Sequence, residues 1–349
     1  MFNNKIELFQ TERNWSQIRE QVYNIIDKEH KNGKAQKGEI VFELEEKLCQ
    51  KFDRKFCITT GNCSDALTIA CLSLNLAPYS KIGVSNFTFI ASAHAIARAR
   101  HIAVPIDITD NCTIDTNKIK DVDAILAVDI FGNISNWKEI KKLGIPTIND
   151  AAQSLESHDG LQYSAKYGDI SCISFSPSKT VSSWGSGGAI LTDDPDIANN
   201  ARLLRLHGKS SNSDIAIGTG LNSMISTFEA ACVYSGLSLS EEWQSRRSSI
   251  SNYLIDVSKY DCNLDKLEKH TYHKLVFESP ARDDIIRKID EKFNIKCGIH
   301  YKTSVNDEKQ YNSKIQYKVS DKKKLSVFTV PNQHTLTDTE VEIIGKALQ

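Results

Sequence analysis

Lys179 and Asp150 are the residues whose types and surroundings point most directly to chemistry. The lysine closes the stretch Ser174-Phe-Ser-Pro-Ser-Lys179, and a glycine-rich run, Gly185-Ser-Gly-Gly188, follows it. The aspartate ends an apolar segment further upstream. A lysine amine forms a Schiff base with the aldehyde of pyridoxal phosphate (PLP), and a carboxylate keeps the pyridine nitrogen of that cofactor protonated. The pair therefore predicts a PLP site.

Both residues also have ordinary structural explanations. A lysine in a loop is most often a solvated surface residue, and aspartate is a preferred N-cap of a helix. For Asp150 alone the two interpretations carry equal weight. The context of Lys179 favours a site, because a strand candidate precedes it and the hydroxyls of Ser174 and Ser176 are suited to hold a phosphate.

Two further segments are suited to hold the rest of such a cofactor. In Thr60-Gly-Asn-Cys-Ser64 an apolar run gives way to a helical pattern, and the amides at a helix start attract anions. Most strand-to-helix turns bind nothing, so this segment is informative only together with the others. Phe87 and Phe89 could cover a planar ring by offset stacking. We expect one of the two phenylalanines to lie in the core instead.

After two helical patterns, apolar runs and further helical patterns alternate from about residue 52 to about residue 195. The runs typical of strands are 55–59, 81–84, 102–106, 124–128, 145–149, 170–175 and 189–192. Apolar residues at helical spacing mark 15–30, 40–52, 64–74, 90–98, 137–143 and 197–206. This alternation predicts an α/β fold with a large, mainly parallel, seven-stranded sheet covered by helices.

The composition changes after about residue 208, where a polar loop over 209–220 and a helix over 224–239 are expected. Beyond them, strand-like runs at 272–277 and 326–330 and a final helix over 338–348 predict a smaller α/β domain. We therefore expect two domains. Residues 1–240 form the large PLP-binding domain with an N-terminal helical segment, and residues 241–349 form the small C-terminal domain.

The overall composition excludes several classes of protein. The 349 residues include 43 Lys plus Arg and 44 Asp plus Glu, a net charge of −1, so no global field indicates nucleic acid or membrane partners. The basic stretch 318–324 is interpreted as a solvated loop or helix face. Nine scattered cysteines without Cys-x-x-Cys spacing argue against a disulfide framework and against a bound metal. Several of them lie in apolar segments, and no signal peptide or membrane span is evident. The expected location is the cytoplasm.

Taken in order along the chain, these motifs resemble the DegT/DnrJ/StrS family of nucleotide-sugar aminotransferases, which are PLP enzymes of fold type I. The resemblance runs from 33–43 to 331–341. Its most specific pieces are Asp150-Ala-Ala-Gln153, Ser174-Phe-Ser-Pro-Ser-Lys179 and Gly185-Ser-Gly-Gly-Ala189. Phe87-Thr-Phe-Ile-Ala-Ser92, Arg205-Leu-His-Gly208 and Gly298-Ile-His-Tyr301 are also similar to the family pattern.

The resemblance implies roles for the residues of the cofactor site. Lys179 would be the Schiff-base lysine, and Asp150 would pair with the pyridine nitrogen. Gln153 would lie beside the ring oxygen of the cofactor, and Phe89 would stack on the ring.

At the phosphate end of the cofactor, Ser174 and the amides of Asn62 and Cys63 would hold the phosphate. Asn222 would reach the same phosphate from a neighbouring subunit, which implies a homodimer with shared active sites.

The chain departs from the family pattern at several positions. It has Asn62 where the family often has Thr or Ser, and Thr180 where Asn usually follows the lysine. It has Met224 in place of a common Arg, and Lys302-Thr-Ser-Val-Asn306 after the His-Tyr pair. The last two changes fall in regions expected to contact substrate or the partner subunit. The sugar, the nucleotide and the aminated carbon therefore stay open.

The function that the resemblance implies is transfer of an amino group from L-glutamate to a nucleotide-linked keto-(deoxy)hexose. The product would be an amino sugar for surface polysaccharide or glycoside synthesis. The alternative is a PLP-binding regulatory or sensor protein of the same fold without sugar transamination. A Rossmann-type oxidoreductase is disfavoured, because no Gly-x-Gly-x-x-Gly follows the first strand candidate.

Overall fold

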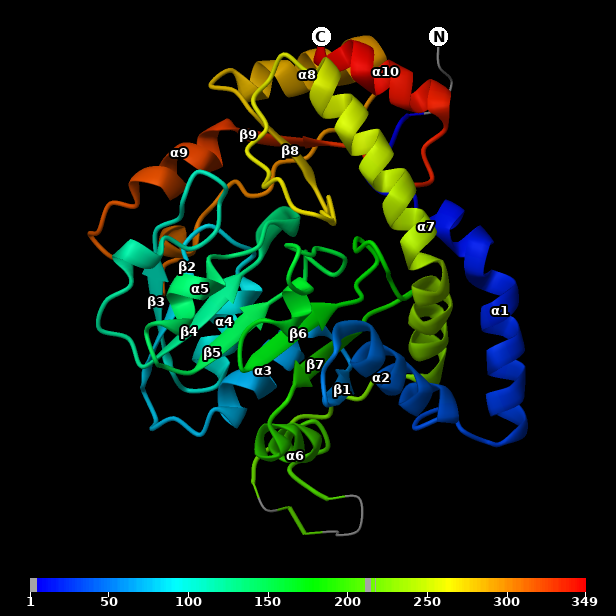
Figure 1. The fold of residues 1–349 in the computed structure, drawn as a ribbon, viewed down its shortest axis with the longest axis vertical. Helices are drawn as coiled ribbons and strands as arrows, with labels where there is room; N and C mark the ends of the chain where they lie inside the picture. Colours follow the sequence, from blue (N-terminus) through cyan, green and yellow to red (C-terminus); the bar gives the residue numbers. More distant parts are fainter. Residues whose placement is uncertain (1–4, 211–214, 217) are drawn as a thin grey trace.

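The computed structural model describes residues 5–210, 215–216 and 218–349. Its centre is a seven-stranded sheet in the order β1-β7-β6-β5-β4-β2-β3 (Figure 1). The strands are β1 (Phe56–Thr60), β2 (Lys81–Ser85), β3 (Ile102–Ile106), β4 (Ala124–Val128), β5 (Thr147–Asp150), β6 (Ile170–Ser174) and β7 (Gly188–Thr192). Strands β3, β2, β4, β5 and β6 pair in parallel, and β7 is antiparallel to both of its neighbours. The predicted mainly parallel α/β sheet is therefore confirmed.

Helices cover both faces of this sheet because its strands are apolar on both sides. The helices of this part are α1 (Thr11–Lys31), α2 (Glu39–Phe52), α3 (Cys63–Ser73), α4 (Ala91–Arg98), α5 (Trp137–Lys141), α6 (Pro195–Leu204) and α7 (Thr227–Val257). All five residues of β4 and of β6 are buried, which is typical of a parallel sheet between two helix layers.

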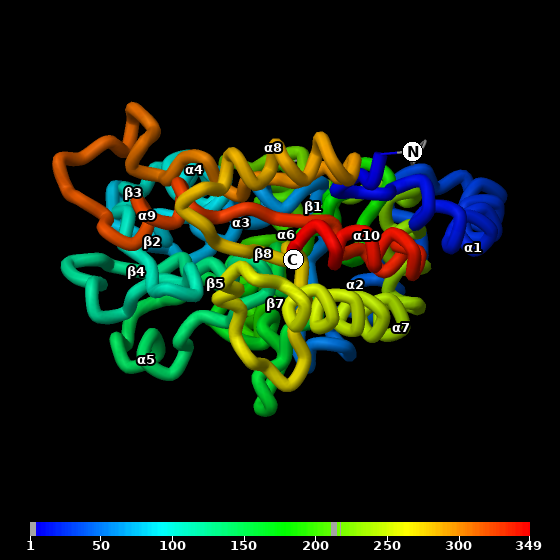
Figure 2. The backbone as a smooth tube through the Cα atoms, turned by 90° about the horizontal axis from the view of Figure 1, so that it is seen from above, coloured from blue at the N-terminus to red at the C-terminus, as the bar shows by residue number. Residues whose placement is uncertain are grey.

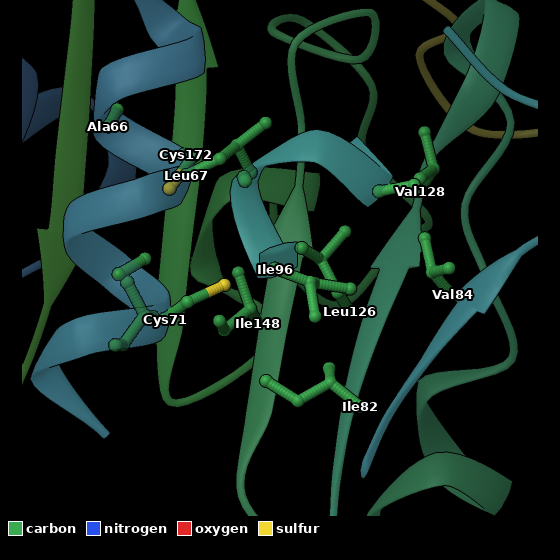
Figure 3. Close-up of a cluster of buried hydrophobic side chains, with 14 of the residues drawn as sticks. Ala66, Leu67, Cys71, Ile82, Val84, Ile96, Leu126, Val128, Ile148 and Cys172 are labelled. Atoms are coloured by element: carbon green, nitrogen blue, oxygen red, sulfur yellow. The ribbon is translucent and has the colours of Figure 1, made fainter. Parts of the chain in front are cut away.

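Alternate residues of the strands enter different cores. Ile58 and Cys172 pack with α3 and α4 in one core, whereas Cys57 and Ile173 pack with α2 and α7 in another. Figure 3 shows the first core, where Leu67 and Cys71 of α3 face Ile148 and the side chains of β2 and β4. The buried cysteines pack as small apolar side chains, as expected from their apolar segments.

A second, two-stranded sheet lies beyond the end of the first. Antiparallel strands β8 (Leu275–Glu278) and β9 (Val327–Val330) pack with α8 (Arg282–Phe293) and α10 (Asp338–Leu348), while α9 (Lys318–Ser326) leads into β9. In Figures 1 and 2 these elements form a layer over one end of the large sheet. Helix α10 begins as predicted, with a capping box between Thr337 and Glu340.

Helix α7 connects the two parts and is longer than predicted. A capping box between Ser226 and Glu229 starts it, and it continues for 31 residues, past the expected end at residue 239. Its first half packs in the core of the large sheet, and Ile250 and Leu254 pack in the core of the small sheet. We propose that 1–240 and 241–349 are two domains which share this helix.

The basic stretch 318–324 is not the solvated face that its composition indicated. It lies in α9, where the side chain of Lys323 is fully buried and forms an ion pair with Glu278 of β8. Its neighbours Lys322 and Lys324 keep more contact with solvent. The prediction was wrong at Lys323 because charge density along a sequence does not show which side of a helix packs on a sheet.

The loop predicted over 209–220 includes residues 211–214 and 217, which lie outside the described residues. Within the described ranges, no helix has the length and apolar character needed to cross a membrane.

The buried ion pair gives a stability prediction. Replacing Lys323 by Met leaves Glu278, whose side chain is 12% exposed, without its cation. Breaking a buried pair from one side should lower the free energy of unfolding by about 3 kcal/mol, measured by urea denaturation. Lys322→Met, on the exposed side of the same helix, is the matched control and should change it by less than about 0.5 kcal/mol. Equal effects of the two substitutions would contradict the role of the pair.

Candidate active site

The ends of neighbouring strands bring the two chemical residues together. Asp150 is the last residue of β5 and pairs in register with Cys172 of β6. Ser174 ends β6, and Lys179 lies in the turn that follows, where its amide donates to the carbonyl of Ser176 (2.9 Å). Ligands of open α/β sheets bind beyond the carboxyl ends of such strands.

A cavity of about 460 Å³ lies at this edge of the sheet. Of the eight predicted site residues, seven line it: Asn62, Cys63, Phe89, Asp150, Gln153, Ser174 and Lys179. Asn222 does not line it. Asn222 is exposed and forms a bridge with Leu206. The structure thus gathers every residue expected from one chain and leaves aside the one expected from a neighbour.

Asp150 is a buried carboxylate with two donors. The hydroxyl of Ser92 donates to Oδ2 (2.7 Å), and the amide of Ala152 donates to Oδ1 (3.2 Å). Burial raises the pKa of Asp150, and these hydrogen bonds only partly oppose the shift. The carboxylate is therefore fixed in orientation, and a cationic ring nitrogen beside it would offset the effect of burial.

The amine of Lys179 responds to the same surroundings in the opposite direction. Burial lowers the pKa of Lys179, although the negative charge of nearby Asp150 opposes this. A lowered pKa increases the fraction of neutral amine, the form that attacks a carbonyl carbon and accepts a proton.

Gln153 is held at both ends of its amide. Its Nε2 donates to the hydroxyl of Tyr301 (3.1 Å), and its Oε1 accepts from the amide of Phe131 (3.0 Å). The ring Nδ1 of His273 lies 3.1 Å from the same Oε1. This network fixes the orientation of the amide in the cavity, which Asp150 and Ala152 also line.

The start of α3 provides an anion site at one end of the cavity. Asn62 is the N-cap, and its Oδ1 accepts from the amide of Asp65 (2.8 Å). Within the described part of the chain, the amides of Cys63 and Ser64 have no hydrogen-bond acceptor. Gly188 packs so closely that an added Cβ would lie 2.7 Å from the nitrogen of Cys63. Free amides at a helix start are suited to a phosphate.

The aromatic prediction is resolved between the two phenylalanines. Phe87 is fully buried in the core, while Phe89 is 56% exposed on the cavity wall. The rings of Phe89 and Tyr301 lie 6.0 Å apart and are tilted by 37°. Phe89 is thus the ring available to a planar ligand.

Sequence reasoning missed the residues that other elements bring to the cavity. Ser92 and Tyr301 stood inside motifs but had no assigned role, while His273, Lys274 and Phe9 had no signal of their own. The segment 272–277 was interpreted only as a strand. Its contribution depends on how the small sheet packs over the large one, which local patterns do not encode.

The fold and the site together define an α/β protein of the fold type I class. The family comparison agrees, because the chain belongs to the DegT/DnrJ/EryC1/StrS aminotransferase family, whose model matches residues 16–349.

Individual relatives are distant but extend over most of the chain. The chain is 26% identical over 364 residues to UDP-2-acetamido-2-deoxy-3-oxo-D-glucuronate aminotransferase of Pseudomonas aeruginosa, covering 98% of this chain and 99% of the relative. It is also 26% identical to a pleiotropic regulatory protein of Geobacillus stearothermophilus, covering 78% and 77%. The crystal structure of ntda from Bacillus subtilis with bound cofactor PMP has a TM-score of 0.91 at 22% identity, covering 100% of this chain and 86% of that chain.

The raised pKa of Asp150 predicts a pH-dependent stability difference in the cofactor-free protein. A carboxyl whose pKa is raised by folding destabilises the folded state once pH exceeds its ordinary value of 3.8. Asp150→Asn should therefore unfold at higher urea concentration than the parent at pH 7, and the two should converge as pH falls below that value.

The control for this measurement is Asp256→Asn, which alters an exposed carboxylate of α7. It should show no comparable difference between neutral and acidic pH. If Asp150→Asn lowered the free energy of unfolding at pH 7, the ionised carboxylate would not carry the cost that its burial implies.

Proposed function

We propose that the protein is a PLP-dependent aminotransferase that moves an amino group from L-glutamate to a nucleotide-linked keto-(deoxy)hexose. The observation that carries the proposal is that Lys179 and the buried Asp150 line the same cavity. The chain that forms this cavity belongs to an aminotransferase family. Relatives named for amination of UDP- and dTDP-linked sugars support this substrate class. The product would be an amino sugar for surface polysaccharide or glycoside synthesis.

The cavity residues fit PLP at each of its functional groups. Lys179 offers an amine for the aldehyde, and Asp150 offers a carboxylate for the ring nitrogen. Gln153 is positioned by its hydrogen bonds to meet the ring oxygen. Ser174 and the amides at Asn62 and Cys63 offer hydrogen-bond donors for the phosphate.

An unpartnered hydroxyl in the same wall also supports a bound ligand. Thr88 lines the cavity, and its buried Oγ1 has no hydrogen-bond partner within the described ranges. Buried polar groups are nearly always satisfied, so such a hydroxyl indicates a partner that binds in the cavity.

PLP, when bound, supplies an aldehyde carbon that takes up the amino group and a ring that withdraws electrons. Lys179 Nζ would bond that carbon in the resting protein. Once the amino donor had displaced it, the neutral Nζ would act as the base that accepts the proton lost from the donor's α-carbon and as the acid that returns it. With the keto sugar, the same nitrogen would supply the proton to the sugar carbon that receives the amine.

Asp150 and the residues around it support that proton transfer. Its carboxylate would hold the proton on the ring nitrogen, and the donors from Ser92 and Ala152 keep the carboxylate oriented. Phe89 would cover one face of the planar ring and limit the access of water to it.

The proposal extends to the assembly and the location of the protein. Asn222 lies outside the cavity of its own chain, which suits a residue that reaches the phosphate in a partner's site. A homodimer is therefore proposed, and sedimentation of the holoprotein at several concentrations tests it.

Free cysteines, several of them buried, are compatible with the reducing environment of the cytoplasm.

A second candidate is a regulatory PLP-binding protein, because the names of two relatives describe regulation or sensory transduction. Such a protein would bind PLP without exchanging its amino group. The departures at Met224 and at 302–306 do not decide between the two functions.

Addition of L-glutamate to the PLP-loaded protein tests the proposed function. The visible absorbance of the bound cofactor should shift to that of the pyridoxamine form, and one member of a panel of nucleotide-linked keto sugars should restore it. Lys179→Ala should lose turnover by about three orders of magnitude or more, since the nucleophile and the proton carrier are the same group.

The control for this substitution is Lys120→Ala, which changes an exposed lysine away from the cavity and should leave the rate unchanged. A parent protein that binds PLP but shows no spectral change with L-glutamate would favour the regulatory function.

A further inference from the structure

Lys274 is a buried cation in the active-site cavity for which the proposed chemistry has no use. It immediately precedes β8 and is 6% exposed, yet it lines the same cavity as Lys179. Its Nζ lies 3.8 Å from the centroid of the Phe9 ring. Among the described residues, no carboxylate forms an ion pair with Lys274 and no acceptor forms a hydrogen bond with its Nζ.

A second buried cation lies beside it. Arg247 of α7 is 5% exposed and lines an adjoining cavity together with Lys179 and Lys274. To the described residues, the guanidinium of Arg247 donates only a long hydrogen bond (3.4 Å), which the carbonyl of Asn332 accepts. Asp150 is the single acidic side chain that the described residues contribute to the lining of the two cavities.

This arrangement leaves two buried basic groups without an acidic partner. Asp150 is already assigned to the ring nitrogen of the cofactor, and the phosphate of the cofactor is assigned to the start of α3. Burial lowers the pKa of Lys274 well below its usual value, and the charges of Lys179 and Arg247 add to the shift, so the neutral amine is favoured unless an anion lies beside it. An anion bound there would pair with the ammonium form and favour it, so the site is suited to an anionic ligand.

The position of Lys274 limits the kinds of molecule that can carry this anionic group. The cavity of about 460 Å³ has room for the cofactor and for the reacting end of a substrate, whereas a nucleotide extends away from the reacting carbon. A group that reaches Lys274 must therefore be close to the carbon that exchanges the amine. In the proposed nucleotide-linked sugar the phosphates are attached at the anomeric carbon, so the acidic groups that we consider for the reacting end are the carboxylates of the amino donor and the C6 carboxylate of a hexuronic acid.

We propose that Lys274 binds a carboxylate of the substrate that reacts at Lys179. The inference rests on the proposed function and specifies it, because it requires an acidic group near the reacting carbon. Two substrates carry such a carboxylate, namely the amino donor and a uronic acid acceptor. Both would enter the same cavity in successive half-reactions, with Arg247 adding long-range attraction from the adjoining cavity.

Two measurements on the PLP-loaded protein separate the sources. The first is the concentration of L-glutamate that gives half the maximal rate of the spectral change. The second is the dissociation constant, by calorimetry, for UDP-glucuronate, compared with that for UDP-glucose, which lacks the carboxylate. The variants are Lys274→Met, which removes the charge at similar length, and Lys274→Arg, which keeps it.

Lys274→Met should weaken the binding of L-glutamate or of UDP-glucuronate by about tenfold or more, because a charge-assisted hydrogen bond is lost. Lys274→Arg should retain most of the affinity, and UDP-glucose should change by less than about twofold with either variant. Loss for L-glutamate assigns the donor, loss for UDP-glucuronate assigns the acceptor, and loss for both assigns a shared site. Lys296→Met, at an exposed lysine outside the cavity, is the matched control.

The proposal is overturned if the Lys274→Met variant has a half-maximal L-glutamate concentration and a dissociation constant for UDP-glucuronate that both lie within about twofold of the parent values. The absorbance of bound PLP and the thermal melting of each variant check that it is folded, and Lys274→Gln repeats the test if the methionine variant is not. Failure of the proposed function is distinguishable. In that case the parent itself gives no spectral change with L-glutamate, while the calorimetric comparison of the two nucleotide sugars still tests Lys274.

Discussion

The burial of Lys179 and Asp150 in one cavity is the constraint on which the rest of the site depends. Burial disfavours the charged form of each group, so the pKa of the amine is lowered and the pKa of the carboxyl is raised. A cofactor with a reactive carbonyl and a basic ring nitrogen relieves both. Neighbouring parallel strands fix the positions of the two groups, because β5 and β6 end at the same edge of the sheet.

The small sheet completes what the large sheet begins. It brings His273 and Lys274 over the cavity, and the segment that contains Tyr301 connects to Gln153 by a hydrogen bond. Helix α7 packs in the cores of both parts and so limits how far they can separate. The large sheet therefore holds the groups that we propose to bind the cofactor, and the small sheet supplies the lysine that we assign to the substrate.

Much of this arrangement was predictable because the local signals are strong. All seven strands of the large sheet were predicted, since strands buried on both faces appear as short apolar runs such as Ala124–Val128. The site residues on these strand ends followed from ordered motifs. Helix α10 was predicted at its observed bounds because Leu336-Thr-Asp338 offers a plausible cap, and in the structure Thr337 caps it together with Glu340.

The remainder depends on contacts between distant segments. The second half of α7 is mostly polar, with widely spaced apolar residues such as Trp243, Ile250 and Leu254, and packing against both cores accounts for its length. Lys323 belongs to a basic run yet is buried against Glu278. Lys274 precedes a short strand and becomes a cavity residue only when the small sheet packs over the large one. In each case a charged or polar side chain is buried by tertiary structure that its neighbours in sequence do not specify.

The most direct test of the central claim locates the bond between protein and cofactor. The protein is incubated with PLP, reduced with borohydride to make the bond permanent, digested and examined by mass spectrometry. We predict that the cofactor mass is found on the peptide that contains Lys179 and on no other lysine, and that Lys179→Ala abolishes it. Labelling of Lys274 or another lysine in the parent, or no labelling at saturating PLP, would contradict the account.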